Sequence, residues 1–196
     1  NPSTSPKFQI PNYKSQINSN FKFQISNLTR RCLVGVGGGK DSIVSMELLK
    51  QKNFDITAFY VQTGRSSPLI DGVIKIMEVG ELQIKRALDP KVHEKHPYNG
   101  HIPISAAYAF LGVFAAKLYG YDSFIVSNEH SSNFGNITYK GLEINHQWSK
   151  SLEFEQLFQN YLKNIGGGVD YFSLLRPFYE IRIAKMFAKY GKKYFK

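Results

Sequence analysis

The sequence predicts an α/β fold in which a doubly wound parallel sheet is flanked by helices on both faces. Short apolar runs recur along the chain without strict alternation of polar and apolar residues, which is typical of parallel strands buried on both faces. Helical stretches separate these runs, so that strand and helix alternate. The chain has 196 residues, of which 42% are hydrophobic, and this is enough for one domain with a substantial core.

The N-terminal segment, residues 1–29, is expected to be a polar basic arm or linker, because Ser, Asn, Gln, Pro and Lys are frequent in it. Phe21, Phe23 and Ile25 alternate with polar residues, which also fits a short strand. We expect the folded domain to cover residues 30–196.

The first half of the domain is predicted to contain three strands and two helices. The apolar run at 32–36 is the first strand, and a glycine cluster connects it to a helix over 41–51 with apolar residues at helical spacing. The β-branched and aromatic run at 56–61 is the second strand. A helix over 72–79 and a weaker strand at 82–87 follow.

The second half begins with a long apolar helix over 103–119, which Pro103 opens and Gly120 stops. The run at 122–127 is the fourth strand, and a polar segment at 128–145 follows it. Two further helical stretches, separated by a Gly-Gly-Gly sequence, are predicted at 149–164 and 177–190.

The formal net charge of +10 lies at the two ends of the chain. Residues 1–31 hold five basic and no acidic residues, and residues 176–196 hold seven basic and one acidic, whereas the stretch between them holds 13 basic and 14 acidic. Because the body is nearly neutral, we expect no nucleic-acid partner. A single cysteine excludes a disulfide scaffold. No apolar run approaches the roughly 18 residues of a membrane span, so we expect no membrane partner. The single cysteine also indicates a cytoplasmic rather than a secreted protein.

The strongest local signal is the sequence VGVGGGKDS over residues 34–42. Glycine amides approach an anion without side-chain obstruction, and the start of a helix near Asp41 adds partial positive charge, so this pattern predicts a phosphate-binding loop. The alternative interpretation is a glycine-rich turn in which Asp41 is the helix N-cap. A Walker A loop would need a glycine at Val34, and a dinucleotide-binding G-x-G-x-x-G that starts at Gly35 would need one at Lys40, so neither fits.

Polar residues also gather at other predicted element ends, where ligands of parallel sheets bind. They lie at 62–67 after the second strand, at 99–101 before the long helix, at 127–132 after the fourth strand and at 145–147. For each of these segments taken singly, helix capping is the alternative interpretation.

The sequence GGGKDS at 37–42 resembles the S-G-G-x-D-S loop of the ATP pyrophosphatase (PP-loop) superfamily, with Gly37 where serine is usual. The resemblance implies an adenine nucleotide alpha hydrolase-like (HUP) fold and cleavage of ATP into AMP and pyrophosphate through an adenylylated substrate. It also implies that Asp41 places Mg²⁺. The residues expected to bind the nucleotide are Gly37, Gly38, Gly39, Lys40, Asp41, Ser42, Thr63, Gly64, Asn128 and Arg176.

Five motifs occur in order over about residues 33–190: GGGKDS, NGHIPIS, SNEHSSNFGN, NHQWSKSLEFE and YFSLLRPFYE. Together they resemble the UDP-N-acetylmuramoyl-L-alanyl-L-glutamate epimerase (MurL) family. The resemblance implies ATP- and Mg²⁺-dependent inversion of the terminal L-glutamate of a UDP-muramoyl dipeptide, in peptidoglycan precursor synthesis for the cell wall. It also implies a truncated C-terminus, because the chain ends before the Cys-containing segment expected of the family.

Four residues are candidates for the chemistry. Histidine titrates near neutral pH, so His101, His130 and His146 are candidate bases for removal of the α-proton. Glu129 is expected to bind Mg²⁺ or to position a substrate group. His130 stands where the family's S-N-E-R sequence has arginine.

Two other functions stay open. One is a tRNA-modifying enzyme of the same superfamily, whose basic ends would contact phosphates. Thiolation would call for active-site cysteines, and Cys32 lies in a predicted buried strand. The other is a non-catalytic module that binds an adenine nucleotide. The sequence gives no signal for an oligomeric state.

Overall fold

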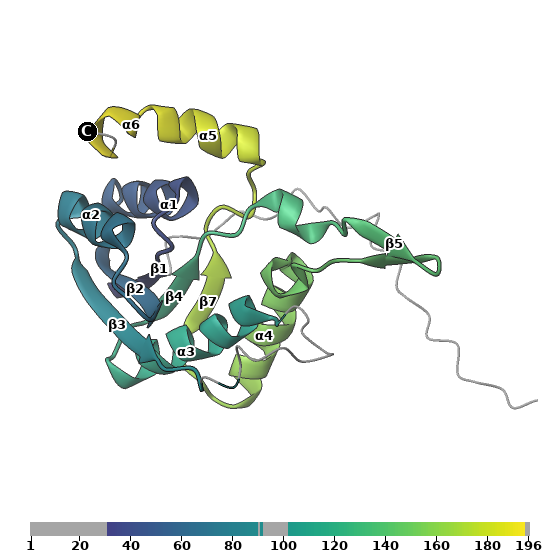
Figure 1. Ribbon diagram of the computed structural model, residues 1–196. Coiled ribbons are helices and arrows are strands. Elements are labelled where there is room, and N and C mark those ends of the chain that lie inside the picture. Colours follow the sequence, from purple (N-terminus) through teal and green to yellow (C-terminus); the bar gives the residue numbers. More distant parts are fainter. Residues whose placement is uncertain (1–30, 90, 92–101, 195–196) are drawn as a thin grey trace, which may run out of the picture.

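Five parallel strands form the sheet at the centre of the structure, a computed structural model that describes residues 31–89, 91 and 102–194 (Figure 1). Their order across the sheet is β3-β2-β1-β4-β7. The chain therefore runs outward from β1 to β3, returns past β1 to β4, and ends the sheet at β7. The strands span Arg31–Gly35 (β1), Asp55–Thr63 (β2), Gly80–Arg86 (β3), Ser123–Val126 (β4) and Asp170–Ser173 (β7).

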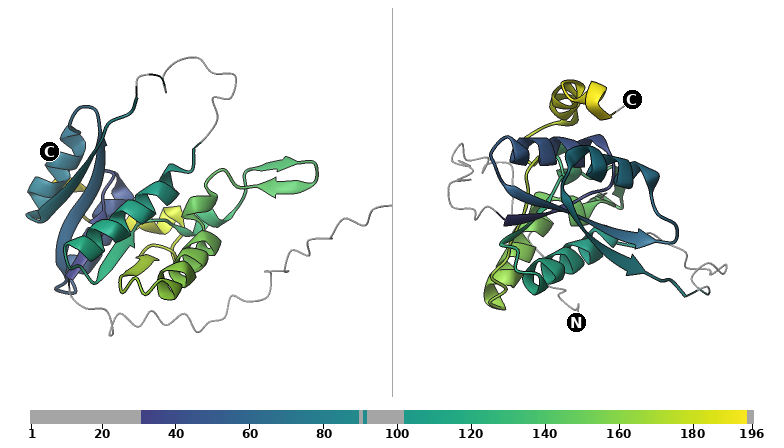
Figure 2. Two further views of the ribbon diagram at one scale, coloured as in Figure 1. Left: turned by 90° about the horizontal axis from the view of Figure 1, so that it is seen from below. Right: turned by 90° about the vertical axis from the view of Figure 1, so that its left-hand side faces the viewer.

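Helices cover both faces of this sheet, as Figures 1 and 2 show from three directions. On one face lie α1 (Lys40–Lys50), α2 (Pro68–Met77), α5 (Glu180–Ala188) and α6 (Gly191–Tyr194). On the other face lie α3 (Ile104–Leu118) and α4 (Leu152–Asn164). The predicted doubly wound α/β fold is confirmed.

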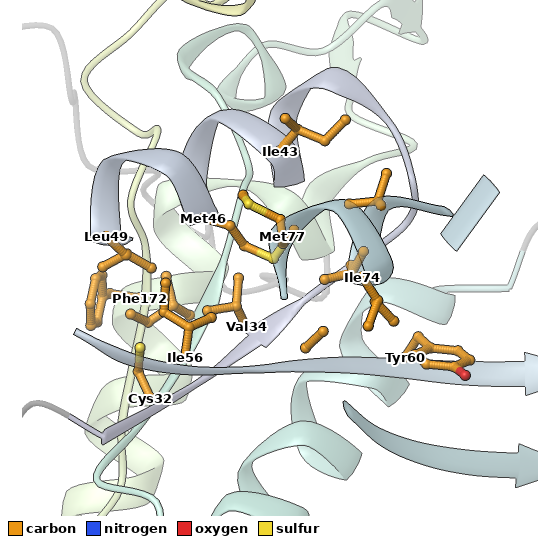
Figure 3. Packing of buried hydrophobic residues seen from close by; sticks show 14 residues of the cluster. Cys32, Val34, Ile43, Met46, Leu49, Ile56, Tyr60, Ile74, Met77 and Phe172 are labelled. Atoms are coloured by element: carbon orange, nitrogen blue, oxygen red, sulfur yellow. The ribbon is translucent and has the colours of Figure 1, made fainter. Parts of the chain in front are cut away.

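Each face of the sheet has its own hydrophobic core, because side chains along a strand point alternately to the two faces. Cys32 and Val34 of β1 pack beneath α1 and α2, where Met46 and Met77 are fully buried (Figure 3). Leu33, between them in the sequence, belongs to the core under α3 and α4. The continuous apolar run of β1 is thus explained by burial on both sides.

The second core depends on a close approach of α3 to the sheet. A Cβ atom added at Gly112 of α3 would overlap the ring of Phe124 in β4, so this position admits no side chain. The Phe124 ring makes an edge contact with Phe59 of β2, with ring centroids 5.2 Å apart. Phe158 of α4 completes the packing against Tyr171 of β7, at 4.9 Å between centroids.

All nine predicted strands and helices are present among the described residues, with ends that differ by a few residues. Helix α2 begins at Pro68, earlier than predicted, and proline suits the first turn of a helix because its missing N–H is not needed there. Helix α4 begins at Leu152, where the Ser151 hydroxyl accepts a hydrogen bond from Phe154 N at 3.2 Å. Helix α5 begins at Glu180, three residues after the predicted start.

Three short strands are absent from the prediction. One is β7, and the others form an antiparallel hairpin of β5 (Ile137–Tyr139) and β6 (Leu142–Ile144), within the segment predicted only as polar. The hairpin projects from the body of the protein (Figure 1). Two short 3₁₀ helices flank it, η4 (His130–Asn133) and η5 (Trp148–Lys150).

The arm expected at 1–29 and the possible strand at 21–25 lie outside the described residues. Within the described part of the chain, no helix combines the length and the apolar character that crossing a membrane requires.

Candidate functional site

A cavity of about 470 Å³ lies at the carboxyl ends of β1, β2 and β4. The strand order reverses there, since β2 and β4 flank β1 on opposite sides, and ligands of doubly wound sheets bind at such a point. The glycine loop, residues 36–39 between β1 and α1, borders the cavity together with the first turns of α3. The volume falls within the range of about 300–1,000 Å³ that is usual for small-molecule sites.

The lining changes in character from β2 to the end of β4. Strand β2 contributes Phe59, Tyr60 and Val61, which are apolar or aromatic. The segment after β4 contributes Ser127 and Asn128, which are polar. This arrangement suits a ligand with one flat apolar part and one charged part.

The glycine loop presents bare backbone to the cavity. A Cβ atom added at Gly37 or Gly39 would meet no other heavy atom within 4 Å, and both residues line the cavity. Gly38 faces the other way: its φ is +78°, and an added Cβ would lie 2.9 Å from Leu69 Cδ2 of α2. The loop is therefore fixed against α2 on one side and open on the other.

Helix α1 begins at the glycine loop without a side-chain cap. Gly39 is the N-cap residue, and the hydroxyl of Ser42 in the first turn donates to Gly39 O at 3.0 Å. Asp41 lies inside the first turn, so the interpretation of Asp41 as N-cap is wrong. Because no side chain caps the helix, amide groups at this end of α1 are left for an anion.

Asp41 is the one carboxylate among the described residues that line the cavity. Its Oδ1 atom is buried and has no hydrogen bond, although Lys40 Nζ lies 3.1 Å away as an ion-pair partner. Lys40 Nζ also lies 3.3 Å from Glu180 Oε1. Burial opposes the charge of Lys40, but these two carboxylates together raise its pKa above the ordinary value.

These residues fit Mg²⁺ bound jointly with phosphate. Across the described ranges, no group of three or more His, Cys, Asp or Glu side chains is arranged to hold a metal ion. Mg²⁺ at phosphate sites is usually held by one or two carboxylates, with phosphate oxygens and water as the other ligands. The buried and incompletely satisfied Oδ1 of Asp41 suits that role.

The segment after β4 contains two predicted catalytic residues, Glu129 and His130, and neither lines the cavity. Glu129 caps η4, where its Oε2 accepts from Ser131 N at 3.1 Å and its Oε1 from the Ser131 hydroxyl. The ring of His130 packs against Tyr179, with centroids 4.4 Å apart. Asn128, by contrast, lines the cavity, and its carbonyl accepts from Ser173 Oγ at 2.5 Å.

Four other predicted residues, His101, His146, Thr63 and Gly64, are not placed at the cavity. His146 Nδ1 lies 2.7 Å from Asn136 Oδ1 at the base of the hairpin. Thr63 Oγ1, at the end of β2, accepts from Arg86 Nε at 3.1 Å, and Gly64 follows with a φ of +80°. His146, Thr63 and Gly64 are not among the residues that line the cavity, and His101 lies outside the described residues.

Arg176 is buried in a polar network instead of lining the cavity. Its Nη2 and Nε atoms donate to Glu155 Oε2 at 2.9 and 3.2 Å. Its Nη1 donates to Glu129 O at 3.2 Å and to Ser132 Oγ at 2.9 Å, and its Nη2 also donates to Lys150 O at 2.8 Å. The guanidinium thus joins β7, α4, η4 and η5.

Sequence reasoning missed several lining residues, among them Lys150, Ser105 and Tyr108. Lys150 lies within the motif NHQWSKSLEFE, but nothing local distinguishes it from an exposed lysine at a helix start. Ser105 and Tyr108 belong to the first turns of α3, which the parallel-sheet rule brings to the same edge. The rule that ligands bind at the carboxyl ends of parallel strands could therefore have indicated Ser105 and Tyr108 as lining residues.

Fold and site together define a doubly wound α/β domain with an open glycine loop at its switch point, the class of fold that the PP-loop resemblance implies. The chain belongs to the MurL N-terminal domain family, whose model matches residues 4–174.

Two curated relatives are named UDP-N-acetyl-alpha-D-muramoyl-L-alanyl-L-glutamate epimerase. The one from Xanthomonas oryzae pv. oryzae is 39% identical over 161 residues, which is 80% of this chain and 35% of the relative. The one from Salinispora tropica is 39% identical over 166 residues, which is 83% of this chain and 36% of the relative. The chain thus spans little more than a third of the length of these relatives.

Among solved structures, the U34-tRNA thiolase NcsA from Methanococcus maripaludis is similar in fold. Its TM-score is 0.58 at 14% sequence identity, and the match covers 86% of this chain and 60% of that chain. At this identity the similarity concerns the fold alone.

Proposed function

We propose that this chain is the ATP-binding part of an epimerase that acts on UDP-N-acetylmuramoyl-L-alanyl-L-glutamate. The observation that carries the proposal is the open glycine loop beside the Asp41 carboxylate, whose Oδ1 atom is buried at the cavity, in a member of the MurL family. The names of the curated relatives support the epimerase role.

The two kinds of lining support a nucleotide as the ligand. The apolar and aromatic residues of β2 and α3 suit a flat base, and the loop amides and the start of α1 suit the phosphates. Asp41 would hold Mg²⁺, which would offset the negative charge of the phosphates there. Ser42, in the same first turn, lines the cavity beside it.

Adenylylation makes the inversion chemically accessible. A glutamate carboxylate is negatively charged, and this charge disfavours loss of the neighbouring α-proton. Attack of a carboxylate oxygen on the α-phosphorus of ATP releases pyrophosphate and leaves an uncharged acyl group. A base then takes the α-proton, a proton is returned to the opposite face, and water cleaves the acyl phosphate to give AMP and the inverted carboxylate.

The proton-transfer roles of His101, Glu129, His130 and His146 remain predictions. His130 and His146 have ring contacts or hydrogen bonds away from the cavity lining, and Glu129 is engaged as a cap.

The thiolation alternative is disfavoured by the state of the single cysteine. Cys32 is fully buried in β1, and burial together with the nearby Asp55 carboxylate raises its pKa to about 12. A thiol that stays protonated and inaccessible is a poor nucleophile.

The test is pyrophosphate release from ATP in the presence of Mg²⁺ and one of two acceptors. We expect release with UDP-N-acetylmuramoyl-L-alanyl-L-glutamate, and glutamate of inverted configuration after hydrolysis of the product. Release with tRNA and not with the dipeptide would support the tRNA-modifying alternative. ATP binding without release in either case would support a non-catalytic nucleotide-binding module.

A further inference from the structure

Lys150 supplies a positive charge at the cavity that the proposed ATP site leaves unassigned. It lines the cavity from η5, at the end of the loop that carries the hairpin. Within residues 31–89, 91 and 102–194, no hydrogen bond or ion pair engages its ammonium group. Lys40, the cation of the GGGKDS motif, is held instead by Asp41 and Glu180 and does not line the cavity.

The backbone at Lys150 is held by the buried guanidinium of Arg176. The Lys150 carbonyl accepts from Arg176 Nη2 at 2.8 Å and from Ser132 Oγ at 3.0 Å. The side chains of Arg176 and its partner Glu155 are 6% and 5% exposed, so this anchor is shielded from water. The backbone from which the Lys150 side chain extends is therefore held in place before a ligand binds.

The same guanidinium fixes the segment after β4. Arg176 Nη1 donates to the carbonyl of Glu129, and Ser173 Oγ donates to the carbonyl of Asn128. The same group of hydrogen bonds, from Arg176 and Ser173, therefore holds the segments of Asn128 and Lys150 at the cavity. The two residues are 22 positions apart in the sequence. An amide and an ammonium in this arrangement match the oxygens of a phosphate or a carboxylate.

The negative charges expected in the occupied cavity also favour a cation near the end of β4. Asp41 is the acid of the described lining, and Lys40 already neutralises part of its charge. ATP carries more negative charge than one Mg²⁺ offsets, and a carboxylate that approaches the α-phosphate adds more. The Lys150 ammonium group beside the cavity would lower that repulsion.

We propose that Lys150 and Asn128 form an oxyanion-binding subsite, on the β4 side of the glycine loop. The inference rests on the proposed ATP site and extends it. Two ligands present the same chemistry there: the phosphate chain of ATP and the terminal carboxylate of the acceptor.

The test compares Lys150→Met with the wild-type chain and with Lys163→Met, which removes an exposed lysine in the last turn of α4. Binding is measured by calorimetric titration with three probes: Mg·ATP, inorganic pyrophosphate and UDP-N-acetylmuramoyl-L-alanyl-L-glutamate. We expect Lys150→Met to weaken the binding of at least one probe about tenfold or more, as for loss of a charge-assisted hydrogen bond. Lys163→Met should leave all three unchanged.

The three titrations separate the two sources of the oxyanion. Weaker binding of Mg·ATP and pyrophosphate assigns the subsite to phosphate, and weaker binding of the dipeptide alone assigns it to the carboxylate. Lys150→Arg should retain most of the affinity. The contacts that hold η5 use the Lys150 carbonyl, so the thermal unfolding midpoint of these variants should not change.

Unchanged affinity of Lys150→Met for every probe would overturn the subsite while leaving the ATP site intact. A wild-type chain that binds neither Mg·ATP nor pyrophosphate would instead overturn the proposed function. In that case a Lys150-dependent affinity for the dipeptide would still support an oxyanion subsite, and its absence would end both proposals.

Discussion

Arg176 and Glu155 form a buried ion pair in which Nη2 of the arginine lies 2.9 Å from Oε2 of the glutamate. Burial raises the pKa of the Glu155 carboxyl, whereas the guanidinium and the Ser173 amide act in the opposite direction. The pair connects α4 to the turn after β7, and through the arginine it holds the carbonyls of Glu129 and Lys150. It thus couples the stability of the domain to the shape of the cavity.

Replacement of Arg176 by methionine should therefore be strongly destabilising. The variant leaves the Glu155 carboxylate buried without its partner, which usually costs about 3–5 kcal/mol of the free energy of unfolding. Urea unfolding of Arg176→Met and of the exposed control Arg182→Met measures the difference. A loss below about 1 kcal/mol for Arg176→Met would mean that the ion pair is not formed in solution.

Two neighbouring glycines should respond differently to alanine. Gly38 has a φ of +78° and no room for a Cβ beside Leu69, so Gly38→Ala should lower the free energy of unfolding by about 1–3 kcal/mol. Gly37 has open space around its Cα, so Gly37→Ala should remain within about 0.5 kcal/mol of the wild type. Thermal or urea unfolding of the two variants checks this, and equal effects would contradict the described loop conformation.

Acid should weaken the attachment of α6 to the domain. Burial of Glu47 opposes its charge, but hydrogen bonds from Lys193 at 2.8 Å and Tyr194 at 2.5 Å hold its pKa below the ordinary 4.5. A lowered folded-state pKa stabilises the fold above the unfolded-state value, and this contribution is lost as the pH falls through the folded-state pKa.

Unfolding free energies from pH 6 down to the acid limit, for the wild type and Glu47→Gln, test the effect. We expect a stability difference at pH 6 that shrinks progressively below the ordinary pKa of about 4.5. A difference that is independent of pH would show that the Glu47 carboxylate is not paired with α6.

The core of the fold was predictable because its signals are local. Residues 32–36 and 56–61 form continuous apolar runs, and burial on both faces of a parallel sheet produces just this pattern. Strand β7 gave no such signal, because its four residues become a strand by pairing with β4, far away in the sequence. The hairpin strands have three residues each, too few to show a period.

The site was predictable only in part, because some of its residues are brought together by contacts between segments far apart in the sequence. The glycine loop and Asp41 are contiguous in sequence, so the motif alone brings them to the cavity. Lys150 reaches it through carbonyl contacts with Arg176, which no local pattern reveals. Arg176 itself was predicted to bind the nucleotide. In the structure it does not line the cavity, because its guanidinium is hydrogen-bonded to Glu155 of α4.

The most direct test of this account is the Mg²⁺ dependence of ATP binding in Asp41→Asn. The substitution keeps the shape of the side chain and removes the one carboxylate of the described cavity lining. Asp71→Asn, at an exposed position in the first turn of α2, is the matched control.

We predict that Mg²⁺ strengthens ATP binding to the wild type and to Asp71→Asn. Asp41→Asn should bind Mg·ATP about tenfold more weakly or worse, with little response to Mg²⁺. If Asp41→Asn instead binds Mg·ATP as tightly as Asp71→Asn, with the same Mg²⁺ dependence, the assignment of the glycine loop and Asp41 as the ATP site is contradicted.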